Sequence, residues 1–363
     1  MNRFVKHILL LLLFVAATTS CERRPLLEIS NTRYVRVYID EEIKNVTYGF
    51  YNPSYLRPAY KTPDVMRVTL ADPITGKVKA ERFLRDKGKD ERGTYYEGYI
   101  VVEPGEYTLM AYNFDTEAVH VDQEYNIEDT KVYTNEIASY LRAKISSRGE
   151  SSSFDNERIV YEPDNLFRTV STGISIPYSE TVDTIYPVDS ECFLAQNVVK
   201  SYYMQVRVKG IQYAASTVGL LTGLSGSCRL IDGNMDTKDS ITVYFELSPN
   251  AAQGVGFEEY AVDGGGAPSD SVVTLYTTFN TFGKIPDAKN QLQITFDFIT
   301  VYGKSYSETF DISKAFATPE GINNNWLLID HMIEIPAPPP VTGNGGFNPD
   351  IDDWDDINTD IKI

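Results

Sequence analysis

Hydrophobic and polar residues alternate along most of this chain, and Tyr, Val, Ile, Thr and Phe fill many of the hydrophobic positions. Alternation with a period of two is typical of a β-strand with one face buried and the other in water. Short turns containing Pro73 and Gly76, and Pro104 and Gly105, predict hairpins between consecutive strands. In the first half of the chain the pattern predicts strands at residues 34–40, 65–71, 77–84, 95–102 and 106–114.

The second half repeats this pattern after a break. Residues 146–157 lose the alternation and are rich in Ser, Gly and charge, which is typical of a loop or a connection between domains. The expected fold is all-β, with two tandem antiparallel β-sandwich domains at residues 31–165 and 166–336. The further strands are predicted at residues 198–211, 240–247, 271–282, 292–303, 305–312 and 326–335.

One helix is predicted in the first half, at residues 132–145. Ile137, Tyr140, Leu141 and Ile145 recur there at steps of three and four residues, which places them on one face of a helix. We expect this helix to pack at the edge of the first sandwich.

The first twenty residues have the three parts of an export signal. Arg3 and Lys6 form a basic start, residues 8–17 are an unbroken hydrophobic run, and small residues follow. A run of about ten residues is half the length that a membrane-spanning helix needs. Residues 1–20 are therefore predicted to be a leader that is removed and not a membrane anchor.

The residue after this leader is Cys21. The segment Thr18-Thr19-Ser20-Cys21 resembles a bacterial lipoprotein box, in which the cysteine thiol receives a lipid and becomes the first residue of the mature protein. Two or three acyl chains hold a protein on a membrane durably. Cys21 is therefore the candidate lipid-attachment residue and residues 21–30 the tether, with a secreted protein carrying an incidental cysteine as the alternative.

The charge of the chain excludes some partners. It has 33 Lys and Arg against 51 Asp and Glu, and the leader holds two of the basic residues and none of the acids, so the remainder carries a net charge of −20. Nucleic-acid binding needs Lys and Arg to neutralise phosphates, so no nucleic-acid partner is expected. An anionic membrane surface is disfavoured for the same reason.

Candidate catalytic or metal chemistry is sparse. The chain after the leader has two histidines, His120 and His331, without a second ligand at metal spacing, and it has no nucleophile or phosphate-loop motif. Residues 232–240 (DGNMDTKDS) open like a calcium loop, but Thr237 and Val243 stand where glycine and glutamate are required. The sequence therefore predicts no enzyme, no cofactor, no metal and no small-molecule substrate.

Two further cysteines, Cys192 and Cys228, remain after the lipid candidate. In an oxidising compartment they could form a disulfide, with two buried free thiols as the alternative, and the sequence leaves both open. The many tyrosines leave a second function open, a surface lipoprotein that binds glycans on aromatic platforms. Most tyrosines fall at alternate strand positions, which favours core and cross-strand packing instead.

The C-terminal residues 337–363 are predicted to be a Pro/Gly linker followed by an acidic tail strand. Aliphatic and aromatic residues are spaced along this tail among many aspartates, a pattern suited to a strand that completes the sheet of a partner. The alternative is a disordered acidic terminus. The candidate partner-binding residues are Phe347, Ile351, Trp354, Ile357 and Ile361.

These features together resemble the FimB/Mfa-like fimbrial lipoproteins of Bacteroides-type bacteria, and within them an uncharacterised lipoprotein branch. The resemblance covers most of residues 30–336 and implies transthyretin-like sandwiches. Besides the lipoprotein box, it is carried by the hairpin segment 104–114 (PGEYTLMAYNF) and by residues 202–211, 216–233, 292–313 and 323–335.

The resemblance implies a non-catalytic subunit in the outer membrane, lipid-anchored through palmitate-type chains and facing the cell surface. Such a subunit anchors a fimbrium or takes part in its assembly by donor-strand contacts with other fimbrial subunits. Shaft subunits of this kind are cut after an arginine near the first domain. Arg23, Arg24 and Arg33 are early enough for such a cut, but it would also remove the lipid. We therefore expect an uncut subunit whose first sandwich is completed by its own residues.

Overall fold

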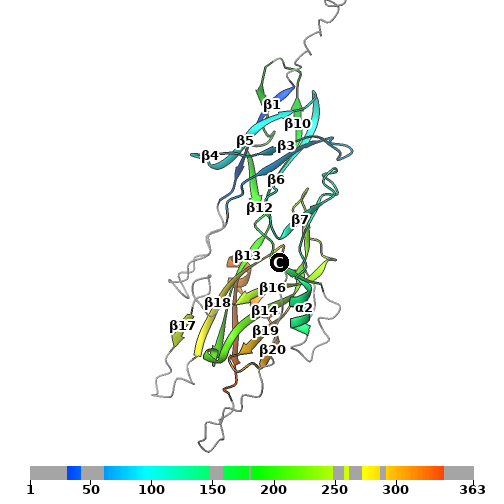
Figure 1. Cartoon of the computed structure of the whole chain (residues 1–363). Helices are drawn as coiled ribbons and strands as arrows, with labels where there is room; N and C mark the ends of the chain where they lie inside the picture. The colour runs from blue at the N-terminus through cyan, green and yellow to red at the C-terminus, as the bar shows by residue number, and fades with distance from the viewer. Residues whose placement is uncertain are drawn as a thin grey trace, which may run out of the picture.

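The computed structural model describes residues 31–41, 61–146, 158–179, 181–247, 257–260, 272–286 and 292–338. Two β-rich units follow one another along the long axis of the molecule, and the described chain starts at the outer end of the first unit (Figure 1). Each unit has its own hydrophobic core, and a small third sheet lies between them.

The first unit is a sheet of nine strands that folds over its own core. The strand order is β3-β2-β6-β10-β12-β1-β5-β4, and β11 pairs with β1 next to β12. Inward residues such as Val35, Val68, Leu109 and Phe193 form the core, as their alternation with polar residues predicts. The strands are β1 (Thr32–Ile39), β2 (Met66–Ala71), β3 (Val78–Leu84), β4 (Asp86–Asp90), β5 (Gly93–Val101), β6 (Gly105–Asn113), β10 (Phe167–Ile176), β11 (Asp183–Thr184) and β12 (Phe193–Asn197).

The second unit is a sandwich of two sheets. One sheet has the order β17-β18-β13-β21 and the other β20-β19-β14-β16-β9. Aromatic residues fill much of the space between them, and the rings of Phe245 and Phe279 stack 5.2 Å apart. The strands are β9 (Ile159–Tyr161), β13 (Lys200–Lys209), β14 (Ala214–Ser225), β16 (Ser240–Leu247), β17 (Phe257–Tyr260), β18 (Val272–Thr281), β19 (Gln293–Thr300), β20 (Ser305–Asp311) and β21 (Trp326–Glu334).

A three-stranded sheet connects the two units. It consists of β7 (Val119–Asp122), β8 (Lys131–Thr134) and β15 (Ser227–Arg229), in the order β15-β8-β7. Its side chains join a separate buried cluster, called the junction cluster here, which draws on β2 and β6 of the first unit and on segments of the second. The members include Ala71, Met110, Tyr112, Val119, Val132, Leu166, Val199, Cys228, Leu230 and Phe282.

Helices are few and short among the described residues. A single 3₁₀ turn (Ile211–Tyr213) joins β13 to β14, and α3 (Ser313–Phe316) and α4 (Pro319–Asn324) join β20 to β21. Helix α2 (Ser139–Ser146) brings Ile145 onto the outer face of the five-stranded sheet, where it clusters with Leu220 and Tyr244.

The all-β class predicted from the alternation is confirmed, and most strand pairs are antiparallel. Four pairs are parallel, namely β1 with β11, β1 with β12, β13 with β21 and β16 with β9. The predicted helix at 132–145 is confirmed from Ser139 onward, where α2 begins. Its first part is wrong, because Val132 and Thr134 belong to β8, which pairs with β7 and β15. Helix α2 also packs on the second unit and not on the first.

The expected domain boundary at residue 165 does not coincide with the strand pairing. Strand β9, before it, pairs with β16 of the second unit, whereas β10 and β12, after it, pair with β6 and β1 of the first. The chain therefore crosses between the units more than once. A division near residue 198 fits the last crossing, since the strands from β13 onward lie in the second unit, apart from β15 in the three-stranded sheet.

Candidate functional site

Strand β1, the first described element after the predicted anchor, lies in the middle of a sheet. On one side it pairs antiparallel with β5, from Thr32 opposite Val101 to Tyr38 opposite Tyr95. On the other side it pairs parallel first with β11 and then with β12. The backbone of β1 is therefore bonded along both edges, so its removal would leave two unpaired strand edges and an open groove.

The inward side chains of β1 fill the core of the first unit. Val35, Val37 and Ile39 are at most 2% exposed. Arg33 continues the same inward face and is also buried, and its guanidinium donates to the carbonyl of Pro177 at 2.5 Å. A charged group that is buried needs a hydrogen-bonded partner of this kind. The backbone of Arg33 is paired on both sides, with Ile100 and with Asp183, so the peptide bond after Arg33 lies inside a paired strand.

The outward side chains of β1 form a network of tyrosine, arginine and carboxylate. Arg36 forms an ion pair with Glu97 at 2.6 Å, and Tyr34 donates to the same carboxylate. The Arg36 guanidinium also lies 4.0 Å from the ring centre of Tyr95. Burial and the hydrogen bond to Glu97 raise the pKa of Tyr34 to about 12. The network fastens β1 to β5 from the outer side, as cross-strand pairs do.

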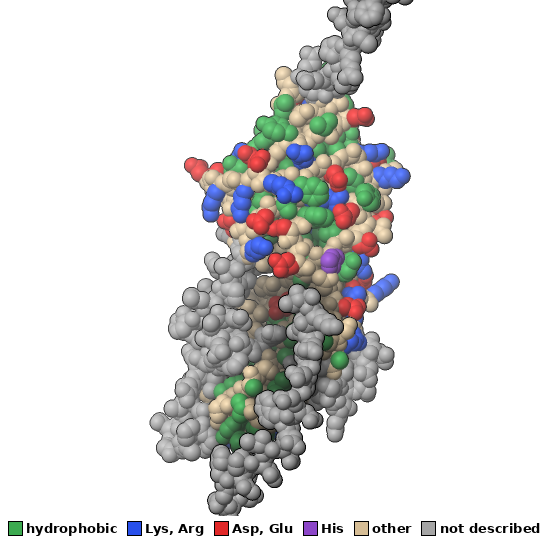
Figure 2. All heavy atoms as spheres, viewed as in Figure 1, with side chains coloured by type: hydrophobic (Ala, Val, Ile, Leu, Met, Phe, Trp, Pro, Cys, Tyr) green, Lys and Arg blue, Asp and Glu red, His purple; other side chains and the backbone are tan. Residues whose placement is uncertain are grey.

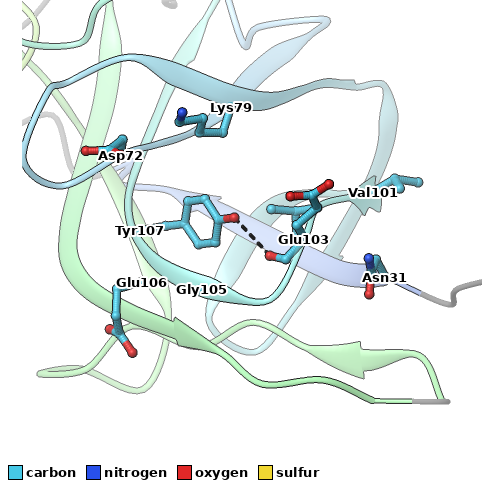
Figure 3. Close-up of a pocket in the computed structure, with 9 residues that line it drawn as sticks. Asn31, Asp72, Lys79, Val101, Glu103, Gly105, Glu106 and Tyr107 are labelled. Atoms are coloured by element: carbon cyan, nitrogen blue, oxygen red, sulfur yellow. Dashed lines mark hydrogen bonds between the residues drawn. The ribbon is translucent and has the colours of Figure 1, made fainter.

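A hollow of about 650 Å³ opens beside the start of β1 (Figure 3). Asn31 lies at its edge, and Tyr107 donates to the Glu103 carbonyl at 2.9 Å across it. The acidic groups lie apart around the rim in Figure 3 and do not converge on one point. The carboxylate of Asp72 accepts hydrogen bonds from the backbone amides of Thr75 and Ile74, in the turn that follows it. These hydrogen bonds lower the pKa of Asp72.

The carboxylates of the acidic loop at 232–240 form ion pairs with basic side chains. Asp232 pairs with Arg229, Asp236 with Lys131 at 2.9 Å, and Asp239 with Arg158 at 3.0 Å. The three carboxylates thus face different partners. Within the described residues, no three His, Cys, Asp or Glu side chains come close enough together to hold a metal ion.

Both later cysteines are free in the structure. Cys192 is half-buried just before β12, whereas Cys228 is buried in β15 within the junction cluster. Burial raises the pKa of the Cys228 thiol to about 12, so this thiol is unreactive. The structure does not join the two residues by a disulfide.

The predicted anchor and the predicted tail lie outside the described residues. This holds for Cys21 and for the tail residues Phe347, Ile351, Trp354, Ile357 and Ile361. What the structure gives is the place where each segment meets the fold. The anchor segment leads into the central strand β1, and the tail follows the edge strand β21. None of the helices in the described part of the chain is long and apolar enough to cross a membrane.

Some charged residues with structural roles gave no signal in the sequence. Arg67, the second residue of β2, is 3% exposed and forms ion pairs with Glu81 and Glu124, and it donates to the Tyr112 hydroxyl at 2.6 Å. Alternation places Arg67 on the outer face of its sheet. The strand pattern alone does not reveal that the segment around β7 covers that face.

The chain belongs to the family described as a domain of unknown function, DUF5119, whose profile matches residues 57–246. The chain is also similar to a Bacteroides ovatus protein provisionally named fimbrium anchoring subunit Fim4B. The two are 23% identical over 291 residues, which cover 76% of this chain and 78% of that protein. The resemblance to fimbrial anchor proteins predicted from the strand segments is thereby confirmed.

Two solved structures are similar to this chain over most of its length. A Bacteroides ovatus protein provisionally described as an adhesin is 19% identical, with a TM-score of 0.51 over 88% of this chain and 98% of that one. This likeness supports the fold alone. The fimbrial anchor protein Mfa2 of Porphyromonas gingivalis is 13% identical, with a TM-score of 0.39 over 82% of this chain and 88% of that one.

Proposed function

We propose that this protein is a lipid-anchored fimbrial subunit of the outer membrane that faces the cell surface and holds a fimbrium there or takes part in its assembly. The observation that carries the proposal is the similarity to Fim4B, because it extends over about three quarters of both chains and is not confined to one domain. The relatives are fimbrial or adhesin proteins by name, and none of these names implies catalysis. These names support the proposal of a non-catalytic role.

The position of β1 supports an anchor over a shaft subunit. A subunit that accepts a donor strand needs an open groove, whereas β1 fills the place between β5 and β12 with its own chain. Arg33 is buried inside that strand, so a protease cannot reach it while the strand is paired. The first unit is thus complete without a partner, as an uncut subunit requires.

The two chain ends would then have separate roles. Cys21 would carry the lipid, and the tether after it enters the fold at β1. At the other end, the spaced hydrophobic residues from Phe347 to Ile361 would add a strand to the next subunit, with the main chain giving affinity and the side chains filling pockets. The aspartates between them would keep free tails from pairing with one another.

The lipid is tested by Cys21→Ala in the native host, with cell-bound and shed fimbrial polymer measured separately. We expect the polymer to move into the medium or to change in length, while the protein stays folded. Cys192→Ala is the matched control, since it also removes a free thiol and should leave the polymer on the cell. Unchanged polymer in the Cys21→Ala strain would refute the anchor role.

A second variant in the same assay tests the tail. Deletion of residues 345–363 leaves every described strand intact, so the protein should remain folded and lipid-bound. It should lose co-purification with fimbrial subunits if the tail is the contact. Capture of those subunits by the truncated protein at the parental level would disprove the tail assignment.

A further inference from the structure

Exposed hydrophobic residues gather at the end of the first unit where the described chain begins. Elsewhere on the described surface, exposed hydrophobic residues such as Ile74 and Ile322 lie on other segments, which is ordinary for a protein surface. Phe83 and Phe114 form a separate pair, with ring centres 5.2 Å apart. The gathered set, called the proximal patch here, has exposed fractions between 52% and 68%. It consists of Tyr99, Val101, Tyr178, Val182 and Tyr186.

Strand pairing around β1 brings these residues together from distant parts of the chain. Val101 and Tyr99, at the end of β5, pair with Thr32 and Tyr34. Across β1 lies β11, which follows Val182 directly. Arg33 bonds the carbonyl of Pro177, the residue before Tyr178, and the amide of Ile185, the residue before Tyr186, donates to the Tyr34 carbonyl at 2.9 Å.

The patch is poor in charge, and the charges next to it are mostly acidic. In Figure 2, hydrophobic and uncharged atoms dominate this end of the first unit, and most charged side chains lie farther from it. Glu103 and Glu106 stand at the rim of the neighbouring hollow, where Lys79 is the one basic side chain among the lining residues, and Asp183 lies in β11. A partner surface must therefore pack against tyrosine and valine side chains at its centre and tolerate carboxylates at its edge.

The tether limits how far this end can be from the predicted lipid. Asn31, whose carbonyl accepts from the Val102 amide at 2.9 Å, is ten residues after Cys21. A fully extended chain of this length spans at most about 35 Å. With a lipid on Cys21, the tether would hold Asn31, which is bonded next to Val101 of the proximal patch, within that distance of the bilayer.

We propose that the proximal patch rests on the lipid headgroup surface of the membrane that holds Cys21, and that it favours phosphatidylethanolamine over anionic lipid. The inference rests on the proposed lipid at Cys21. Tyrosine prefers the membrane–water interface, because its ring is apolar and its hydroxyl stays hydrated. The ammonium group of phosphatidylethanolamine complements the acidic rim, whereas an anionic headgroup would repel it.

Docking of this kind does not need a patch with high intrinsic affinity for the membrane. A short flexible tether raises the effective concentration of the second contact to about the millimolar range. Contact that would be negligible for a free protein therefore becomes the main state of the anchored one. The result is a protein held upright, with its second unit away from the membrane.

The experiment uses the full lipidated chain in vesicles, with a fluorophore on a cysteine introduced by Val101→Cys and a quencher on the lipid headgroups. Val301→Cys is the matched control, because Val301 is 61% exposed and its amide bonds the Tyr213 carbonyl, in the second unit. Cys192→Ser removes the half-buried thiol from both samples, and Cys228 is buried and stays unlabelled.

In phosphatidylethanolamine and phosphatidylcholine vesicles, we expect quenching at position 101 to be several-fold stronger than at position 301. Replacing phosphatidylethanolamine by phosphatidylglycerol should weaken it at low salt, and Tyr99→Ser with Tyr186→Ser should reduce it as well. Equal quenching at the two positions would overturn the proposal. A change at position 101 that depends on protein concentration without vesicles would also overturn it, since a second copy would then cover the patch.

The result separates this proposal from the anchor on which it rests. Incorporation of labelled palmitate into the parent, but not into Cys21→Ala, is measured first. If the protein is lipidated but quenching is equal at the two positions, the docking proposal fails and the anchor proposal stands. Absence of palmitate removes the anchor, and the docking proposal with it.

Discussion

Glu162 is a half-buried acidic residue in the chain segment between the two units. It stands between β9 of the second unit and β10 of the first. Its carboxylate accepts one hydrogen bond, from the backbone N–H of Asn280 at 2.9 Å. Burial raises its pKa to about 7. One hydrogen bond offsets only part of the cost of removing a carboxylate from water.

This raised pKa makes the free energy of unfolding depend on pH. Between pH 4.5, the usual pKa of the group, and pH 7, the folded protein binds more protons at Glu162 than the unfolded one, so stability falls as pH rises through that window. Glu162→Gln keeps an acceptor for Asn280 and removes the titration. It should raise the free energy of unfolding at pH 8 by on the order of 2 kcal/mol and leave it almost unchanged at pH 4.5.

Urea unfolding at several pH values measures this effect. Glu91→Gln, which replaces an exposed carboxylate in the turn between β4 and β5, is the control and should follow the parent at every pH. A Glu162→Gln curve parallel to the parent between pH 5 and pH 8 would show that the carboxylate is solvated.

At the level of elements, β1 determines whether the first unit is stable. Val37 is fully buried at the centre of this strand, so Val37→Ala removes two methyl groups from the core and should lower the free energy of unfolding by about 2 kcal/mol. Val101→Ala, the same substitution at a residue that is 68% exposed, should change it by less than about 0.5 kcal/mol. Urea unfolding of the unlipidated chain measures both.

Limited trypsin digestion adds a test of the pairing itself. The bond after Arg33 should resist cleavage in the parent and become sensitive in Val37→Ala, because weaker packing lets β1 open more often. Mass spectrometry identifies the cut. Rapid cleavage after Arg33 in the parent would mean that β1 leaves the sheet readily, and the anchor argument from β1 would fail.

The sequence predicted strands where hydrophobic and polar residues alternate, and it predicted hairpins where turn residues join two such segments. The segments at 65–71 and 77–84 appear as the β2–β3 hairpin, and 34–40 appears as β1, since alternation and turn residues determine such elements. The local pattern does not predict pairing between segments that are far apart in the sequence. The residues of 167–176 do not indicate that this segment pairs with β6, and for this reason the expected boundary at residue 165 does not match the sheets.

The candidate site divides in the same way. Alternation placed Val35 and Val37 inside, but it could not show that β1 is bonded on both edges, because that depends on β11 and β12 more than 140 residues later. The burial of Arg33 has the same cause, since its partner Pro177 belongs to that distant segment. Cys21 could be proposed as the lipid-attachment residue from the sequence alone, because a leader and a lipoprotein box are local patterns.

At the scale of the molecule, the junction cluster couples the two units. An interface between domains is usually polar and permits relative motion, but here buried residues such as Met110, Leu230 and Phe282 form a core of their own. The chain also crosses the junction more than once, at β9–β10 and at β12–β13. A subunit that links a membrane to a fimbrium would benefit from such stiffness.

The coupling predicts that the parent unfolds in one calorimetric transition. Leu230→Ala removes a fully buried side chain from the junction cluster while both unit cores keep their residues, so the units should separate into two transitions. Leu327→Ala makes the same change in the core of the second unit, and it should lower the melting temperature while one transition remains. Two transitions in the parent would show that the units already unfold independently, and the junction cluster would then be a contact without mechanical consequence.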